Sequence, residues 1–143
     1  MKQVTSSVFI ISSLVAVAMG GLQEFIEKHK DKSDTCVEKS NFQEENVLPL
    51  LKGEMEVSHE GKCYLDCLLV ELGVMVDGKF SVETAKHHSD HYYADNEEKR
   101  EKAYKIIDEC AAEATSDDEC EAAHQLFLCF KSKREEHGFD EED

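Results

Sequence analysis

Basic side chains are scarce in this sequence of 143 residues. It holds 16 lysines and arginines against 32 aspartates and glutamates, which gives a formal net charge of −16 with neutral histidines. Nucleic acids are bound through clustered lysine and arginine, and the most basic stretch, Lys131 to Arg134, is followed at once by Glu135 and Glu136. We therefore expect no nucleic-acid partner, and the negative charge favours high solubility.

Long apolar runs are also scarce, and the main one lies over residues 8–18. It is too short to cross a bilayer, Lys2 precedes it, and small residues follow it. This arrangement is typical of a secretory signal peptide. We interpret residues 1–20 in this way, with cleavage after Ala18 or Gly20, and expect a secreted, extracellular protein without membrane insertion.

Residues 21–143 show no linker, internal repeat or strand alternation that would mark a second domain. They hold 15 basic and 32 acidic side chains, so their net charge is 15 − 32 = −17. This length is enough for one domain with a modest core. We expect a single domain with an acidic tail from Glu135, in which Phe139 makes the main apolar contact.

Motifs of catalysis and metal binding are absent from the sequence. It has no Gly-x-Ser-x-Gly, no glycine-rich calcium loop and no Cys-Cys-x-x-His-Asp stretch like that of secreted phospholipases A2. Paired Cys-x-x-Cys units, typical of structural zinc, do not occur. His87 and His91 have a spacing that a metal could use, but this pair is short and common. We expect no enzyme activity, no cofactor and no metal.

Helical periodicity fills most of the chain after residue 20, which has one proline, Pro49. Helices are predicted over residues 22–39, 43–52, 63–72, 82–90 and 96–114, with a sixth opened by a capping box at residues 116–119. Pro49 either lies in the first turn of the second helix behind Asn46 or kinks that helix. Residues 74–78 are interpreted as an apolar exit from the third helix and a turn.

Six cysteines lie after the predicted signal peptide, and this even number predicts three disulfides. Cys63 and Cys67 share one face of the third predicted helix, so each can reach a different partner segment. Cys120 and Cys129 lie roughly 13 Å apart along the last helix and cannot bond to each other. A bond from Cys110 to the later part of that helix is possible, and Cys120 is free to meet the third helix.

The whole cysteine spacing resembles that of the six-cysteine pheromone-binding and general odorant-binding proteins of insects. Three residues separate Cys63 from Cys67 and eight separate Cys120 from Cys129, and these two gaps are the distinctive ones of that family. The resemblance implies an all-α bundle of about six helices around an apolar cavity, held by three interlocked disulfides. It implies the pairs Cys36–Cys67, Cys63–Cys120 and Cys110–Cys129.

The function that the resemblance implies is that of a secreted carrier. Such a protein takes odorants, pheromones or similar volatiles through aqueous fluid, with the small apolar ligand as partner and a membrane chemoreceptor or a second copy as possible further partners. The alternative is a secreted signalling, salivary or haemolymph protein of the same fold with a different ligand or a solid core, because fold alone does not establish function.

Apolar residues of the later helices and their connections are the candidates for the cavity wall. Tyrosines among them could orient an alcohol or a carbonyl group. The candidate set is Leu68, Leu72, Met75, Phe80, Tyr92, Tyr93, Ile106, Ile107, Phe127 and Phe139. We also expect a pH response from His87, His88 and His91, because these neighbours gain like charges between about pH 7 and pH 5.

Overall fold

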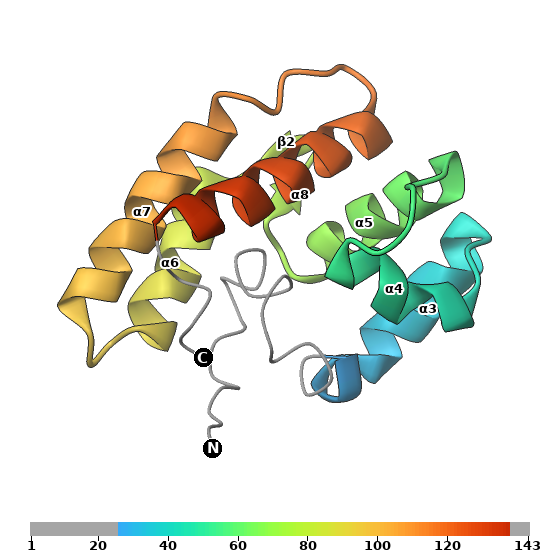
Figure 1. Cartoon of the computed structure of the whole chain (residues 1–143), viewed down its shortest axis with the longest axis horizontal. Coiled ribbons are helices and arrows are strands. Elements are labelled where there is room, and N and C mark those ends of the chain that lie inside the picture. Colours follow the sequence, from blue (N-terminus) through green and yellow to red (C-terminus); the bar gives the residue numbers. More distant parts are fainter. Residues whose placement is uncertain (1–25, 138–143) are drawn as a thin grey trace.

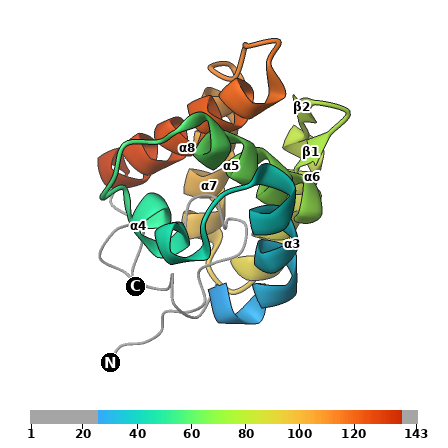
Figure 2. The same cartoon turned by 90° about the vertical axis from the view of Figure 1, so that its right-hand side faces the viewer.

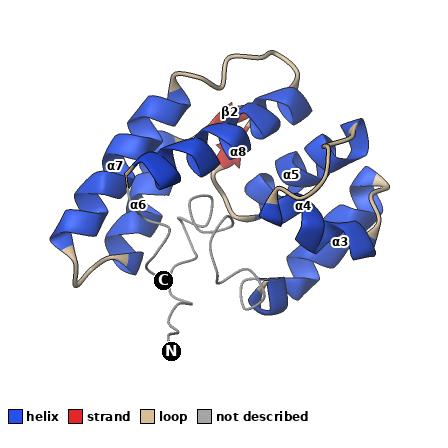
Figure 3. Cartoon of the chain, in the orientation of Figure 1, coloured by secondary structure: helices blue, strands red, loops and turns tan. Residues whose placement is uncertain are grey.

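The computed structural model describes residues 26–137, so the predicted signal peptide and Phe139 lie outside the described residues. The described part is mostly helical, as predicted (Figures 1 and 3). Its elements are α3 (Lys30–Ser40), the 3-10 helix η2 (Glu44–Asn46), α4 (Val47–Lys52), α5 (His59–Glu71), β1 (Met75–Val76), β2 (Lys79–Phe80), α6 (Val82–Tyr92), α7 (Glu97–Ala111) and α8 (Glu119–Glu136). No helix within these residues is long and apolar enough to cross a membrane.

Helix α8 joins the two sides of the fold. It packs against α5 on one side and α7 on the other, while α3 packs on α5 and α6 packs on α7. Figure 1 shows α8 lying across the molecule between α7 and α5, and Figure 2 shows α3 beside α5. The helices α5 and α8 therefore have the central places in the arrangement.

The interior contains one cluster of buried apolar side chains to which most helices contribute. Tyr64 of α5 is fully buried in it and stacks on Phe42, with 5.4 Å between the ring centroids. Its hydroxyl oxygen lies 2.8 Å from Ser33 Oγ of α3, so the polar end of the ring is hydrogen-bonded inside the core. Burial disfavours the phenolate and raises the pKa of Tyr64 to about 12.

The start of α8 differs from the predicted capping box. Asp118, and not Ser116, is the N-cap, and its side chain accepts hydrogen bonds from the N–H groups of Cys120 and Glu121. The N–H groups of Thr115 and Ser116 donate instead to the side chain of Gln125. The segment before α8 is therefore folded back on the helix, and α7 ends at Ala111, before the predicted limit of residue 114.

A short β-hairpin replaces the turn that was predicted over residues 74–78. Strands β1 and β2 pair antiparallel, with Met75 opposite Phe80 and Val76 opposite Lys79. The turn residues Asp77 and Gly78 have φ values of 54° and 77°, as a two-residue hairpin turn requires. The hairpin was not predicted, because the sequence shows no strand alternation, although Asp-Gly between apolar residues is itself a hairpin signal.

Pro49 is the third residue of α4, so the first of its two predicted placements is correct. The backbone donors of a first helical turn have no partner inside the helix, and proline therefore removes no helical hydrogen bond at this position. Asn46 stands at the N-cap, but its side chain makes no capping hydrogen bond.

Three disulfides join the helices, and they are the pairs that the resemblance implies. Cys36–Cys67 links α3 to α5, Cys63–Cys120 links α5 to α8, and Cys110–Cys129 links α7 to α8. Their Cα–Cα distances are 5.5, 4.5 and 5.6 Å, within the usual range for a disulfide. Helix α5 is thus held at two points one turn apart.

Removal of the α5–α8 disulfide should lower the stability strongly. A closed loop with a sequence separation of 57 contributes about 4 kcal/mol in the chain-entropy model. We expect the double variant Cys63→Ala, Cys120→Ala to lose an unfolding free energy of this order in urea. Val70→Ala, an exposed position on the same helix, is the control and should change little. Equal stability of the double variant and the control would contradict the expectation.

Candidate functional site

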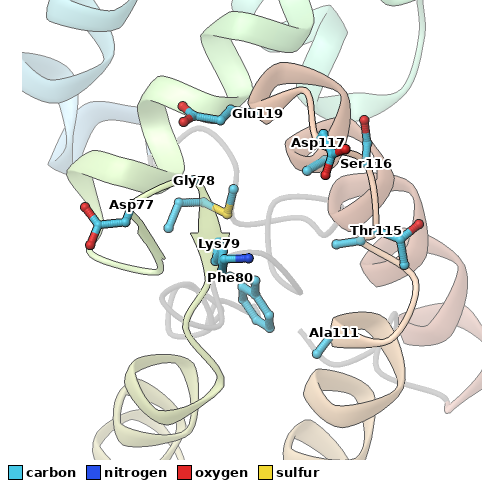
Figure 4. Close-up of a pocket in the computed structure, with 12 residues that line it drawn as sticks. Asp77, Gly78, Lys79, Phe80, Ala111, Thr115, Ser116, Asp117 and Glu119 are labelled. Carbon is cyan, nitrogen blue, oxygen red and sulfur yellow. The ribbon is translucent and has the colours of Figure 1, made fainter.

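A cavity with a volume of about 550 Å³ lies between the β1–β2 hairpin and the connection from α7 to α8 (Figure 4). We call it the hairpin cavity. Its wall consists of Met75, Asp77, Gly78, Lys79, Phe80, Ala111, Ala114, Thr115, Ser116, Asp117, Glu119 and Ala122. The volume lies in the range of sites for small organic molecules.

The apolar part of this wall is continuous with the protein core. Met75 and Ala122 are buried, with exposed fractions of 2% and 3%, and Phe80 is half-buried. The Phe80 ring packs edge-on against Phe130 of α8, with 5.9 Å between the centroids, and Phe130 is itself only 1% exposed. An apolar group bound beside Phe80 would therefore leave water and extend the core.

The polar part of the wall lies mainly on the turn of the β1–β2 hairpin and on the connection from α7 to α8. Figure 4 shows Asp117 and Glu119 at the end of the cavity away from Phe80, with the Glu119 side chain reaching over the hairpin turn. The Asp77 carboxylate points away from the cavity, whereas the Lys79 amine points from the hairpin towards the α7–α8 connection. No carboxylate oxygen of the described residues lies within 4.0 Å of this amine nitrogen. Among residues 26–137, the Lys79 ammonium therefore has no carboxylate partner that a ligand would have to displace.

The hairpin turn lies close to the first turn of α8. A Cβ atom added at Gly78 would lie 2.7 Å from Glu119 Oε2, and glycine also suits the φ of 77° at this position. Glu119 occupies the first turn of α8, where the helix dipole favours a carboxylate. A side chain at residue 78 would therefore displace the Glu119 carboxylate and strain the backbone of the turn.

The α5–α8 contacts fix the position of this end of α8. Cys120 is bonded to Cys63, and Lys62 Nζ lies 2.9 Å from Glu121 Oε1. Burial, followed by the charges of Glu119 and Asp118, raises the pKa of Asp66. The cavity wall formed by the start of α8 is thus held to α5 by a covalent bond and an ion pair.

The structure brings two of the ten predicted ligand contacts, Met75 and Phe80, into the hairpin cavity. The others are distributed through the buried cluster. Leu68, Ile106, Ile107, Phe127 and Tyr93 are buried there, Leu72 and Tyr92 are half-buried against it, and Phe139 lies outside the described residues. Sequence reasoning missed the alanines and the loop residues of the wall, because small side chains carry no periodic signal and the hairpin was not predicted.

The three candidate histidines on α6 do not converge on one site. His87 and His91 are exposed, and His87 lies in an open groove of about 690 Å³ with Glu83, Thr84, Lys86 and Asp90. His88 is half-buried, and its Nε2 lies 3.2 Å from the carbonyl oxygen of Leu72 at the end of α5. Residues 26–137 contain no group of three or more histidine, cysteine, aspartate or glutamate side chains that could hold a metal ion.

Comparison with known proteins shows the family of the chain. The model of the PBP/GOBP family matches residues 22–133. General odorant-binding protein 28a of Drosophila melanogaster is 26% identical over 117 residues, which cover 81% of this chain and 82% of that protein. General odorant-binding protein 19d of the same species is 25% identical over 116 residues, 78% of this chain and 75% of that protein. A helical domain with these three disulfides is of the odorant-binding class, and the chain belongs to the PBP/GOBP family.

Solved structures show the same fold. Odorant-binding protein 28a of Drosophila melanogaster has a TM-score of 0.68 and 26% identity, over 81% of this chain and 97% of that one. A fatty acid binding protein, OBP56a, from the oral disk of the blowfly Phormia regina has a TM-score of 0.62 and 22% identity, over 79% of this chain and 94% of that one. At this identity the second match shows the fold alone.

Acidification should lower stability through His124 of α8. Burial lowers the pKa of His124, followed by the charge of Lys62, while Glu121 opposes both. A pKa below the ordinary 6.5 means that the unfolded chain binds the proton more readily, so stability decreases as the pH falls below 6.5. We expect the urea midpoint to fall between pH 6.5 and about pH 5 more in the parent than in His124→Gln.

The raised pKa of Asp66 acts in the opposite direction at lower pH, because the folded state then takes up the proton first. Asp66→Asn is therefore a useful second variant that separates the two effects. The same loss of stability on acidification in the parent and in His124→Gln would contradict a role for this histidine.

Proposed function

We propose that this protein is a secreted carrier that binds small hydrophobic molecules, such as odorants, pheromones or similar volatiles, and carries them through aqueous fluid. The observation that supports this function best is the hairpin cavity, with Met75 and Phe80 continuing the buried core, in a chain of the PBP/GOBP family. We propose no catalytic role.

Secretion is part of this proposal. The sequence of residues 1–20 has the pattern of a signal peptide, and three disulfides suit an oxidising compartment. N-terminal sequencing of the secreted protein should give Met19 or Gly21 as the first residue. A membrane chemoreceptor and a second copy of the chain are the proposed partners beyond the ligand.

The binding affinity should be moderate. A ligand that buries about 300 Å² of apolar surface gains roughly 7 kcal/mol, which corresponds to a dissociation constant of about 10 μM before the losses of association, so we expect micromolar or weaker binding. Leu68, Leu72, Ile106, Ile107, Phe127, Tyr92 and Tyr93 remain proposed contacts for ligands that extend from Phe80 into the buried cluster. Phe139 remains a proposed contact of the tail.

Displacement of a fluorescent apolar probe tests the carrier function at the hairpin cavity. We expect apolar ligands to displace the probe from the parent, and Phe80→Ala to weaken binding by about tenfold, because the main aromatic wall is lost. Val76→Ala is the matched control, since Val76 lies on the same hairpin with 51% of its surface exposed and outside the cavity wall. Circular dichroism should show that both variants are folded.

Absence of displacement by a diverse ligand panel would contradict the carrier function and favour the alternative of a signalling, salivary or haemolymph protein. Equal ligand affinity of Phe80→Ala and Val76→Ala would be consistent with the carrier function but would show that the ligand does not bind beside Phe80.

The histidines of α6 should make ligand binding weaker in acid. Protonation places up to three positive charges over His87, His88 and His91, and their repulsion favours a looser end of α6. We expect the parent to lose a few-fold to about tenfold in affinity between about pH 7.4 and pH 5, and the triple glutamine variant to lose less. Glutamine at residue 88 still offers a donor to the Leu72 carbonyl oxygen. Equal pH dependence in both proteins would remove these histidines from the response.

A further inference from the structure

The charged groups around the hairpin cavity restrict the kind of molecule that it can take, an inference that rests on the proposed carrier function. Of the twelve wall residues, Asp77, Asp117 and Glu119 are acidic, and Lys79 is the single basic one. The whole chain also has a net charge of −16. A carboxylate in the cavity would meet two acidic side chains, Asp117 and Glu119, against the single ammonium of Lys79, and also the negative field of the protein, so the balance of these charges raises its free energy.

A cationic head group meets a different obstacle. The Lys79 amine points into the space between the two cavity walls, while Asp77 points away from that space (Figure 4). No carboxylate of the described residues pairs with this amine within 4.0 Å, so none of them neutralises its charge by a direct contact. An ammonium bound beside Lys79 would be repelled at close range.

A neutral head group avoids both penalties, and Lys79 decides which neutral group fits. An ammonium donates hydrogen bonds and cannot accept them, so the matching atom is an acceptor. A carbonyl oxygen needs no acceptor in return, whereas an alcohol also has a proton to donate. The Glu119 side chain lies over the hairpin turn, and Ser116 Oγ accepts from the Asp118 N–H. A carbonyl oxygen is therefore satisfied by Lys79 alone, whereas an alcohol must reach Lys79 and one of the wall carboxylates, Asp117 or Glu119, at the same time.

We propose that the hairpin cavity selects neutral carbonyl compounds, ketones or esters, whose oxygen accepts a hydrogen bond from Lys79 Nζ while the hydrocarbon chain lies against Met75, Phe80 and Ala122. The apolar side chains and the hydrogen-bond donor are separated along the cavity in the same way as the hydrocarbon chain and the oxygen of such a molecule. Phe80 continues the core at one end of the cavity, and the polar loop residues lie at the other. A hydrogen bond to a charged donor adds to the affinity that hydrophobic burial gives.

The test compares three ligands with the same chain of about ten carbons: a methyl ketone, the alkane and the carboxylate. Each is titrated against a bound fluorescent probe. In the parent we expect the ketone to bind more tightly than both others. In Lys79→Met, which keeps the length of the side chain but removes the donor, ketone affinity should fall about tenfold and alkane affinity should not change. Lys79→Arg keeps a donor and should retain most of the preference for the ketone.

The matched control is Lys52→Met, because Lys52 is an exposed lysine at the end of α4 outside the cavity wall and its loss changes the net charge by the same amount. It should leave all three affinities unchanged. Urea unfolding of each variant shows whether the fold is intact.

The outcomes separate this proposal from the carrier function. If the alkane displaces the probe but Lys79→Met leaves ketone binding unchanged, or lowers it no more than Lys52→Met does, the carrier function stands and carbonyl selection is overturned. Tighter binding of the carboxylate than of the ketone by the parent also overturns it. If neither the alkane nor the ketone displaces the probe, the carrier function itself fails.

Discussion

The structure depends on the double attachment of α5. Cys67 bonds to α3 and Cys63 bonds to α8, so one turn of α5 fixes the distance and direction of two other helices. The same helix contributes the fully buried Tyr64, whose hydroxyl pairs with Ser33 across the α3–α5 contact. Two disulfides and a buried hydrogen bond thus all hold the same short segment of α5. This constraint allows a small domain to keep part of its apolar surface around a cavity and not in a closed core.

The sequence predicts the helical part of this arrangement well, for physical reasons that can be named. Cysteine spacing limits which segments can meet, and the periodic apolar residues mark the buried faces of the helices, as at Ile106 and Ile107 of α7. Pro49 in the first turn of α4 obeys the general rule for proline. The apolar pattern and the position of the proline depend on neighbours within a few turns of the chain, so local reasoning can find them. The pairing of the cysteines joins residues 19 to 57 positions apart and was implied by the family resemblance.

The cavity could be predicted only in part, because its walls depend on contacts between distant segments. Met75 and Phe80 were found as apolar residues in a connection, but their pairing across the hairpin was missed. Ser116 was predicted as a helix cap. Instead, the side chain of Gln125, nearly two turns into α8, accepts hydrogen bonds from the N–H groups of Thr115 and Ser116. The position of Glu119 over Gly78 likewise arises from the packing of α8 on the hairpin and leaves no local pattern.

The two turns that enclose the hairpin cavity lie outside the disulfide-bonded faces of α5, α7 and α8. Lys79, Thr115 and Asp117 are exposed and can change without disturbing the three bridges or the buried cluster. Within such a frame, the chemistry of the cavity wall and the stability of the fold are separate properties of the chain, because short surface segments form much of the wall and the bonded helices hold the fold. The architecture therefore permits divergence. A few substitutions in these exposed loops would change the chemistry of the cavity wall in a related chain and lower its folding stability little.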